Sequence, residues 1–503
     1  MRIARERVLW GLVGLGTVVR LWLVALPSSL GLDEFGSWWV TNGAFGSIPS
    51  RAHLFPQSML YAAILWPVRA VAGESEISLR LPSLIAAGAA LYCVYRLGTL
   101  LVDRETGALA AGIFVGVPEV CFSAADARPY AFGILAATAA LWMLVRWLDG
   151  GRWVDAAGYV LLAAAAVYFQ YLFATMFVAH AIYAARRLSR DCATSWRQVL
   201  GATVALGVLM LPAAWLVKGI ARFASLHAFA PRPGSWDLVR TIASSSVLAA
   251  LAGSLVLCLG LGRLLRPRDC VSWAPARAAG GRDGMWLISL TAFAPALALF
   301  AVSRLTGTSV FVSRYAACAI PGQVILMAWF LRGLEPRSRR LASLGGYLLI
   351  MIAARGAKVA HTPEDWRGAV ATLNAVDGDH PLLFSGTYAE SRSVAWVDSL
   401  SHCDYMKAPL DYYRSQGRAV VLPLNSGAAS EEYVDRVVGT LLGLPAERDR
   451  IVLLERASRS PSWVPWLRER LGDRGYRAEK FWGRGNLSLW RFELDGSTRA
   501  RGR

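Results

Sequence analysis

Two adjacent carboxylates stand near the start of the chain, directly after its first apolar stretch. They are Asp33 and Glu34, in the segment GLDEF at 31–35. Neighbouring residues of a helix point about 100° apart, so only one of the two acids can face a given site. A carboxylate within hydrogen-bond reach of a hydroxyl group can act as a general base. One acid is therefore a candidate base, and the alternative for either is a helix cap at a solvated loop.

Two arginines stand at the entrances of later apolar segments. Arg128 lies in ADARPY at 125–130, and Arg314 lies in FVSRY at 311–315. A guanidinium group matches a phosphate with two parallel hydrogen bonds, so each arginine is a candidate phosphate ligand. The alternatives are an ion pair between Asp126 and Arg128, and an Arg314 side chain that extends to the lipid head groups.

The composition of the 503 residues indicates a membrane protein. Hydrophobic residues make up 55% and charged residues 17%, and the mean hydropathy is +0.40. A soluble globular chain carries roughly 25% charged residues. The net charge of +18 arises from arginines in short clusters between apolar runs, which is typical of membrane loops and argues against a nucleic-acid groove. The seven cysteines form no CxxC pair and are expected to be small buried hydrophobes.

Eleven apolar segments predict a polytopic α-helical membrane protein. A helical span needs about 20 mostly apolar residues. The segments 155–168 and 172–186 are short, and one long helix across both is an alternative. The expected spans are 8–26, 80–101, 107–122, 130–147, 155–168, 172–186, 198–216, 243–264, 285–303, 315–332 and 341–355.

Arginine placement predicts the orientation in the membrane. Arginines precede the first span and follow the sixth, eighth and tenth, which places them on one side that should be cytoplasmic. The N-terminus is then cytoplasmic, and the opposite side receives loops 27–79, 123–129 and 304–314 together with the C-terminal tail. The arginines are Arg2, Arg5, Arg7, Arg186, Arg187, Arg190, Arg197, Arg266, Arg268, Arg277, Arg282, Arg332, Arg337, Arg339 and Arg340.

Two domains are expected. Residues 1–355 form the membrane domain, whose external loop 27–79 carries interfacial helices such as 57–73. From residue 356, Asp, Glu and Arg become frequent, and short apolar runs alternate with helical stretches. This alternation predicts a small extracytoplasmic α/β domain over 356–503.

The order of the polar motifs resembles that of a known enzyme family. LDE at 32–34 is followed by GESEISLRLPS at 73–83, ADARPYAFG at 125–133, SRYAACAIPG at 313–322 and EDWRGAVATL at 364–373. In this order they resemble the bacterial relatives of the protein O-mannosyltransferases and of the lipid A aminoarabinose transferase. These enzymes share the membrane glycosyltransferase architecture called GT-C. The resemblance covers about the first 375 residues.

The resemblance implies a glycosyltransferase of the bacterial inner membrane. Such an enzyme moves a sugar from a polyprenyl-phosphate donor to a glycan, lipid or protein acceptor on the extracytoplasmic face. By resemblance, Asp33 matches the catalytic base, and Glu34 matches the second acid, whose role is structural or acceptor-positioning. Since a lipid phosphate is a good leaving group, a positive clamp suffices and no proton donor is needed. A single displacement of this kind inverts the anomeric configuration.

The remaining site residues follow from the same motifs. Asp126 and Arg128 match the second loop of the family, and Arg314 matches the arginine before the tenth span. Arg128 and Arg314 are the expected donor-phosphate ligands, and Asp126, Tyr130 and His53 are positioning candidates. His53 lies in AHLFPQS at 52–58, which departs from the familiar patterns. No metal is therefore assigned, although a divalent metal is compatible with the family.

A transporter or flippase of a lipid-linked substrate is the alternative function. Transporters usually place ionisable residues at mid-membrane and show repeated halves. Here the polar motifs fall at one surface and the sequence shows no repeat, so the enzyme is favoured. An assembly protein whose external domain binds a partner is a further alternative, but it leaves the three aligned motifs unexplained.

Overall fold

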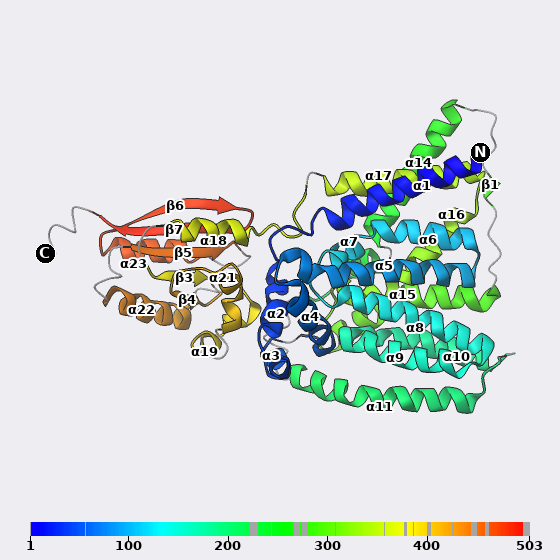
Figure 1. Ribbon diagram of the computed structural model, residues 1–503, viewed down its shortest axis with the longest axis horizontal. Coiled ribbons are helices and arrows are strands. Elements are labelled where there is room, and N and C mark those ends of the chain that lie inside the picture. Colours follow the sequence, from blue (N-terminus) through cyan, green and yellow to red (C-terminus); the bar gives the residue numbers. More distant parts are fainter. Residues whose placement is uncertain are drawn as a thin grey trace. The chain divides into compact units, whose positions relative to one another are not determined.

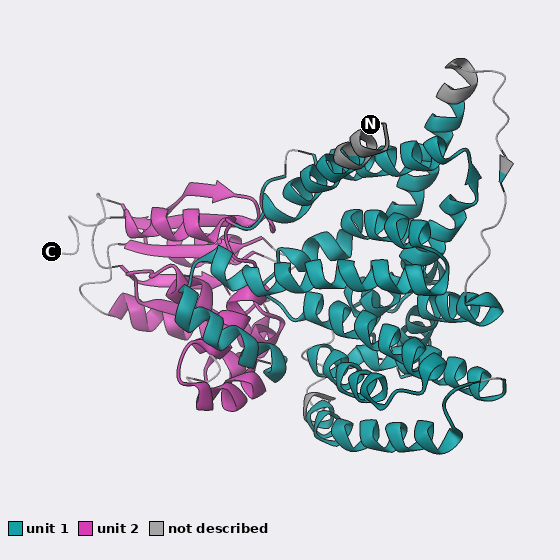
Figure 2. Ribbon diagram, turned by 45° about the vertical axis from the view of Figure 1, so that its right-hand side comes forward, with its two compact units in different colours: residues 1–26, 58–359 teal, residues 27–57, 360–503 magenta. Residues whose placement is uncertain are grey.

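The chain forms two compact units in a computed structural model (Figure 2). Unit 1 consists of residues 1–26 and 58–359, and unit 2 consists of residues 27–57 and 360–503. The expected division at 355 differs from these units, because the loop 27–57 groups with the C-terminal part of the chain. The structure describes residues 2–55, 57–190, 192–221, 230–242, 244–265, 272–273, 280–306, 308–356, 358–376, 380–385, 387–399, 404–424, 427–443, 450–457 and 462–495.

Unit 1 is a bundle of helices (Figure 1), and each of the eleven predicted segments falls on helix. The alternative of one long helix over 155–186 is wrong, because the first helix ends at Phe169 and a 3-10 turn follows. The helices are α1 (Arg2–Val18) with η1 (Val19–Leu23), α4 (Met59–Ala72), α5 (Glu76–Leu101), α6 (Arg104–Gly116), α7 (Pro118–Ala124), α8 (Tyr130–Gly150), α9 (Trp153–Phe169), η3 (Tyr171–Thr175), α10 (Met176–Leu188), α11 (Trp196–Ala221), α13 (Ser235–Ile242), α14 (Ser245–Leu265), α15 (Gly281–Leu305), η4 (Ser313–Ala319), α16 (Ile320–Arg332) and α17 (Arg337–Arg355).

Among the described residues, five helices are long and apolar enough to cross a membrane. The number rises to seven if two bent helix pairs each count as one span. One of these pairs is α6 and α7, which meet at an angle of 68°. Pro118 is the first residue of α7, and a proline cannot donate the hydrogen bond that would continue α6. The full count of eleven spans stays a prediction.

Two glycines allow α5 and α6 to approach each other closely. A Cβ atom on Gly98 would lie 2.9 Å from the Cα atom of Gly107. A Cβ atom on Gly107 would lie 2.5 Å from the carbonyl oxygen of Tyr95. Small residues are the usual means by which helices in lipid pack backbone against backbone.

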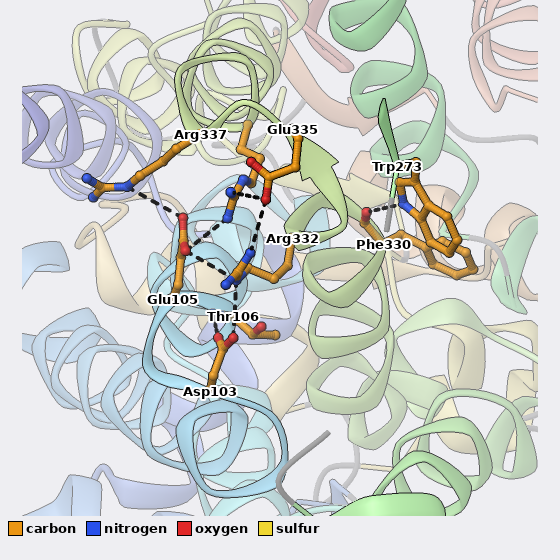
Figure 3. A network of polar contacts seen from close by, with 9 residues as sticks. Asp103, Glu105, Thr106, Trp273, Phe330, Arg332, Glu335 and Arg337 are labelled. Atoms are coloured by element: carbon orange, nitrogen blue, oxygen red, sulfur yellow. Dashed lines mark hydrogen bonds and ion pairs between the residues drawn. The ribbon is translucent and has the colours of Figure 1, made fainter. Parts of the chain in front are cut away.

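A charged network joins two turns at one end of the bundle (Figure 3). Arg332 at the end of α16 lies 3.1 Å from Asp103 and 3.2 Å from Glu105, while Arg340 lies 2.9 Å from both Glu105 and Glu335. Burial alone would raise the pKa of Asp103. Hydrogen bonds from Thr106 and the charge of Arg332 outweigh burial and hold this pKa below its usual value.

Other arginine-rich turns lie at the same end. Arg186 and Arg190 contact Asp283 at 2.6 and 2.7 Å, and the Gly280 N–H donates to the carbonyl of Leu101 at 3.0 Å. The network of Figure 3 begins two residues after Leu101. Arginines thus gather at this end as the sequence predicts, although Arg266, Arg268 and Arg277 lie outside the described residues. The assignment of this end to the cytoplasm stays a prediction.

Unit 2 is built on a five-stranded sheet of order β4-β3-β5-β7-β6. Strand β3 pairs in parallel with β4 and with the central strand β5, and β7 pairs antiparallel with β5 and β6. The residues of β3 are all buried, as expected for a parallel strand covered on both faces. The strands are β3 (Leu382–Ser385), β4 (Ala419–Leu422), β5 (Arg450–Arg456), β6 (Tyr476–Arg484) and β7 (Leu487–Leu494), and the longer helices are α2 (Leu32–Thr41), α3 (Ile48–Leu54), α18 (Trp366–Asn374), α22 (Ala428–Gly443) and α23 (Val464–Gly472).

The glycine contact between α5 and α6 gives the first prediction. Gly107→Ala should lower the free energy of unfolding by about 1–3 kcal/mol, because the new methyl group forces two backbones apart. Thermal unfolding of the purified protein in detergent measures the effect. Gly88→Ala on α5 is the matched control, since a Cβ atom there meets nothing within 4 Å. Equal melting temperatures for the two variants would contradict this account of the packing.

Candidate functional site

The two acids of the LDE motif lie in the first turn of α2, in unit 2. Gly31 precedes the helix in an extended conformation, and its N–H donates to Oε2 of Glu34 at 2.6 Å. Glu34 is buried, whereas Asp33 is partly exposed. Glu34 therefore closes the N-terminus of α2, and Asp33 is the more accessible of the two carboxylates.

Two tyrosine hydroxyls from the C-terminal part of unit 2 hold the segment before α2. The Tyr413 hydroxyl accepts from the Leu30 N–H at 3.1 Å and lies 3.1 Å from Oγ of Ser29. The Tyr388 hydroxyl donates to the carbonyl of Leu32 at 3.1 Å. Hydrogen bonds thus fix the backbone immediately before Asp33, through partners that lie more than 350 residues later in the chain.

Aromatic packing holds the buried face of α2 within the same unit. The Phe35 ring meets those of Trp366, Tyr412 and Tyr413 at centroid distances of 5.9, 5.7 and 5.9 Å. Trp38 meets Tyr412 at 5.4 Å. These edge-to-face pairs make α2 part of the core of unit 2.

Two histidines of unit 2 bear on the site, the positioning candidate His53 and His361. His53, on α3, is exposed and forms no hydrogen bond or ion pair with any residue that the structure describes. A ring nitrogen of His361 instead lies within 4.8 Å of a carboxylate oxygen of Glu34. Carboxylate and imidazole groups are both of kinds that bind divalent cations.

The second predicted motif forms a buried loop between α7 and α8 in unit 1. Asp126 is buried, and its carbonyl accepts from the Arg128 N–H at 2.8 Å. The carbonyl of Arg128 accepts from the Ser83 hydroxyl of α5 at 3.2 Å. The loop is therefore attached to α5, and α8 begins one residue after Pro129.

Tyr130 brings the two predicted phosphate ligands together. The guanidinium carbon of Arg128 lies 5.8 Å from the centre of the Tyr130 ring, and that of Arg314 lies 5.6 Å from it. Arg314 belongs to η4 and also lies 5.5 Å from the ring of Tyr315. Two guanidinium groups from distant parts of the sequence thus share one buried aromatic ring. Their combined charge makes this end of unit 1 suited to a phosphate.

Arg80 was not predicted as a site residue, although it lies in the motif GESEISLRLPS at 73–83. Arg80 is fully buried on α5 and donates to the carbonyls of Ala25 and Leu26 at 3.2 and 2.8 Å. Ala25 and Leu26 also pack against Ala125 of the buried loop. An arginine within an apolar stretch is the signal that could have identified this residue.

Comparisons with known proteins agree with this architecture. Residues 56–215 match the family described as dolichyl-phosphate-mannose-protein mannosyltransferase. The solved structure of ArnT from Cupriavidus metallidurans in the apo state is similar, with a TM-score of 0.59, 11% identity, and coverage of 97% of this chain and 98% of that one. The same enzyme bound to undecaprenyl phosphate gives a TM-score of 0.60, 12% identity, and coverage of 96% and 98%.

Residues 56–215 thus match a mannosyltransferase family, and the chain as a whole has the fold of ArnT. Both matches agree with the resemblance inferred from the motif order, and the apolar helices among the described residues support a multi-pass membrane protein. A search of curated protein sequences finds no match. At 11–12% identity, the structural likeness to ArnT shows the fold alone. The roles of individual residues therefore follow from the geometry of this chain.

The hydrogen bonds of Tyr413 give the second prediction. Tyr413→Phe should leave the buried Leu30 N–H without its partner, at a local cost of about 1–3 kcal/mol. Backbone amides at the start of α2 should then exchange hydrogen faster, as hydrogen-exchange mass spectrometry measures. Thr440→Ala, which removes an exposed helical hydroxyl elsewhere in unit 2, is the control. Unchanged exchange in Tyr413→Phe would show that this hydroxyl does not hold the segment.

Proposed function

We propose that this protein transfers a sugar from a polyprenyl-phosphate donor to an acceptor hydroxyl, with inversion at the anomeric carbon. The observation that carries the proposal is the pair of guanidinium groups, Arg128 and Arg314, on the ring of Tyr130. Each guanidinium can give two parallel hydrogen bonds to a phosphate. Together they form a clamp for an anionic lipid head group at the end of the helical bundle.

The reaction requires positive charge around the leaving phosphate and does not require a general acid. In the transition state the bond between the anomeric carbon and the phosphate oxygen breaks, and negative charge grows on the phosphate. Preorganised positive charge stabilises this growth without any proton transfer. Arg128 and Arg314 supply that charge, and the packing of both against Tyr130 limits how far they can move.

The acceptor hydroxyl must lose its proton as its oxygen attacks the anomeric carbon. We assign this general-base role to Asp33, because it is the more accessible acid of α2. Glu34 is engaged at the N-terminus of the helix through the Gly31 N–H, so its role is structural. One base and no acid gives a single displacement, in contrast to the two carboxylates of glycosidases.

Two comparisons support a lipid-linked donor. The family matched by residues 56–215 is described by a dolichyl-phosphate-mannose substrate, and ArnT has been solved with undecaprenyl phosphate. The clamp also lies at the end of the bundle opposite the arginine-rich turns of Figure 3. Ser83, in the first part of α5, donates to the carbonyl of Arg128, whereas Leu101, the last residue of α5, lies two residues before Asp103 of those turns. By the positive-inside rule we place the reaction on the extracytoplasmic face of a bacterial inner membrane.

The role of Asp33 gives the third prediction. Asp33→Asn should retain the fold but lower turnover by about 10²–10⁴-fold, the usual effect of losing a general base. Turnover is measured with radiolabelled polyprenyl-phosphate sugars and crude envelope acceptor. Asp398→Asn, at an exposed acid of unit 2, is the control. Near-normal turnover in Asp33→Asn, or a product of retained configuration by NMR, would exclude this mechanism.

The clamp gives the fourth prediction. Arg128→Ala and Arg314→Ala should each weaken donor binding by about 10–100-fold, since charged hydrogen bonds contribute roughly 1.5–3 kcal/mol. Arg128→Lys should fall between, because it keeps the charge but loses the planar fork. Binding of a polyprenyl phosphate by calorimetry in detergent measures the effect. The exposed Arg304 provides the control variant Arg304→Ala, and equal affinity in all four variants would remove both arginines from the phosphate site.

A further inference from the structure

A second group of arginine and aromatic side chains belongs to α5 and α8, which pack against each other, and Tyr92 and Arg96 of this group are exposed. The guanidinium carbons of Arg96 and Arg146 lie 5.2 and 5.5 Å from the Trp142 ring. Arg96 also donates to the Tyr92 hydroxyl at 2.8 Å and lies 5.8 Å from its ring. We call these four residues the Trp142 surface.

The Trp142 surface lies inside the ends of two membrane spans. Both α5 and α8 are among the helices long and apolar enough to cross a membrane. Arg96 stands five residues before Leu101, the last residue of α5, and Arg146 stands four residues before Gly150, the last of α8. At 1.5 Å per residue, the charges lie about 6–8 Å within the helix ends. Ionisable groups at such depth usually have a partner of opposite charge or extend toward the lipid head groups.

The protein supplies that partner for only one of the two arginines. Arg146 lies 3.1 Å from Asp155 at the start of α9. Arg96 is exposed, and within the described part of the chain no carboxylate pairs with it. Asp155 is moreover shared with Arg152 at 3.9 Å, so this cluster carries a net positive charge. An anion from outside the protein would balance it.

The face of α5 that carries Arg96 also offers a path for an acyl chain. Ile85 and Tyr92 are 64% and 52% exposed, and Leu81 is exposed on the same helix. Residues 81, 85, 92 and 96 are separated by four or seven positions, so they form one strip along the helix. The strip presents apolar side chains toward the middle of the span and a guanidinium group near its end. A phospholipid has the same order, with its acyl chains toward the middle of the membrane and its phosphate near the surface.

We propose that the Trp142 surface binds an anionic phospholipid, with the phosphate on Arg96 and an acyl chain along Leu81, Ile85 and Tyr92. The rings of Tyr92 and Trp142 hold the guanidinium plane, so its donors are arranged for a phosphate before the lipid arrives. The unbalanced positive charge favours a lipid of net negative charge over a zwitterionic one. This site is separate from the clamp at Tyr130, which lies at the other end of α8.

Native mass spectrometry of the purified protein tests the proposal. The protein in detergent is mixed with equal amounts of phosphatidylglycerol and phosphatidylcholine, and the bound lipids are counted. The native protein should retain phosphatidylglycerol preferentially. Arg96→Gln should lower its affinity by about fivefold, the usual contribution of one arginine near an anionic surface. The exposed Arg104→Gln, at the start of the next helix, should leave it unchanged.

Three results would overturn the proposal. They are equal retention of both lipids by the native protein, equal losses in Arg96→Gln and Arg104→Gln, and displacement of phosphatidylglycerol from the Arg96-dependent site by an equimolar polyprenyl phosphate. If Arg96→Gln does not fold, Arg96→Lys replaces it, because lysine keeps the charge but loses the fork and the stacking. Affinity in Arg96→Lys should then fall below that of the native protein, and native affinity would contradict the assigned geometry.

Discussion

A backbone carbonyl buried in a membrane protein cannot accept a hydrogen bond from water, so a donor group of the protein must supply that hydrogen bond. Arg80 meets this constraint at the end of the first helical segment. Its guanidinium group donates to the carbonyls of Ala25 and Leu26, the last residues of unit 1 before the chain enters unit 2. Arg80 belongs to α5, so these hydrogen bonds fix Ala25 and Leu26 to that helix. The same helix also supports the 125–130 loop, because its Ser83 donates to the carbonyl of Arg128.

Charge is organised differently at the two ends of this bundle. At one end, arginines of α10, α16 and α17 meet acids of neighbouring turns, and these pairs join loops that are distant in sequence. At the other end, Arg128 and Arg314 lie against the ring of Tyr130. A ring attracts a guanidinium group without neutralising it. The first arrangement suits a fixed scaffold, and the second brings two guanidinium groups from distant parts of the sequence to one ring.

The sequence predicted the helices well because apolar runs are long and contiguous. All eleven runs fall on helix, and the alternation of loops placed Arg128 and Arg314 at one end, where Tyr130 joins them. The grouping of residues 27–57 with the C-terminal part could not be predicted. It depends on contacts such as Phe35 with Trp366 and Leu30 with Tyr413, which have no periodicity in the sequence. The proximity of His361 to Glu34 could not be predicted for the same reason.

The grouping of α2 with the C-terminal part bears on how a general base can be held in place. The helix has only ten residues, and isolated helices shorter than about 12–15 residues are marginal in water. Its order must therefore come from tertiary contacts, and Phe35 and Trp38 supply them within unit 2. A catalytic group has to be held to within about 0.5 Å of its productive position. If Asp33 is the base, the aromatic core of unit 2 and the hydroxyls of Tyr388 and Tyr413 are what give it that precision, and the C-terminal residues are part of the catalytic apparatus.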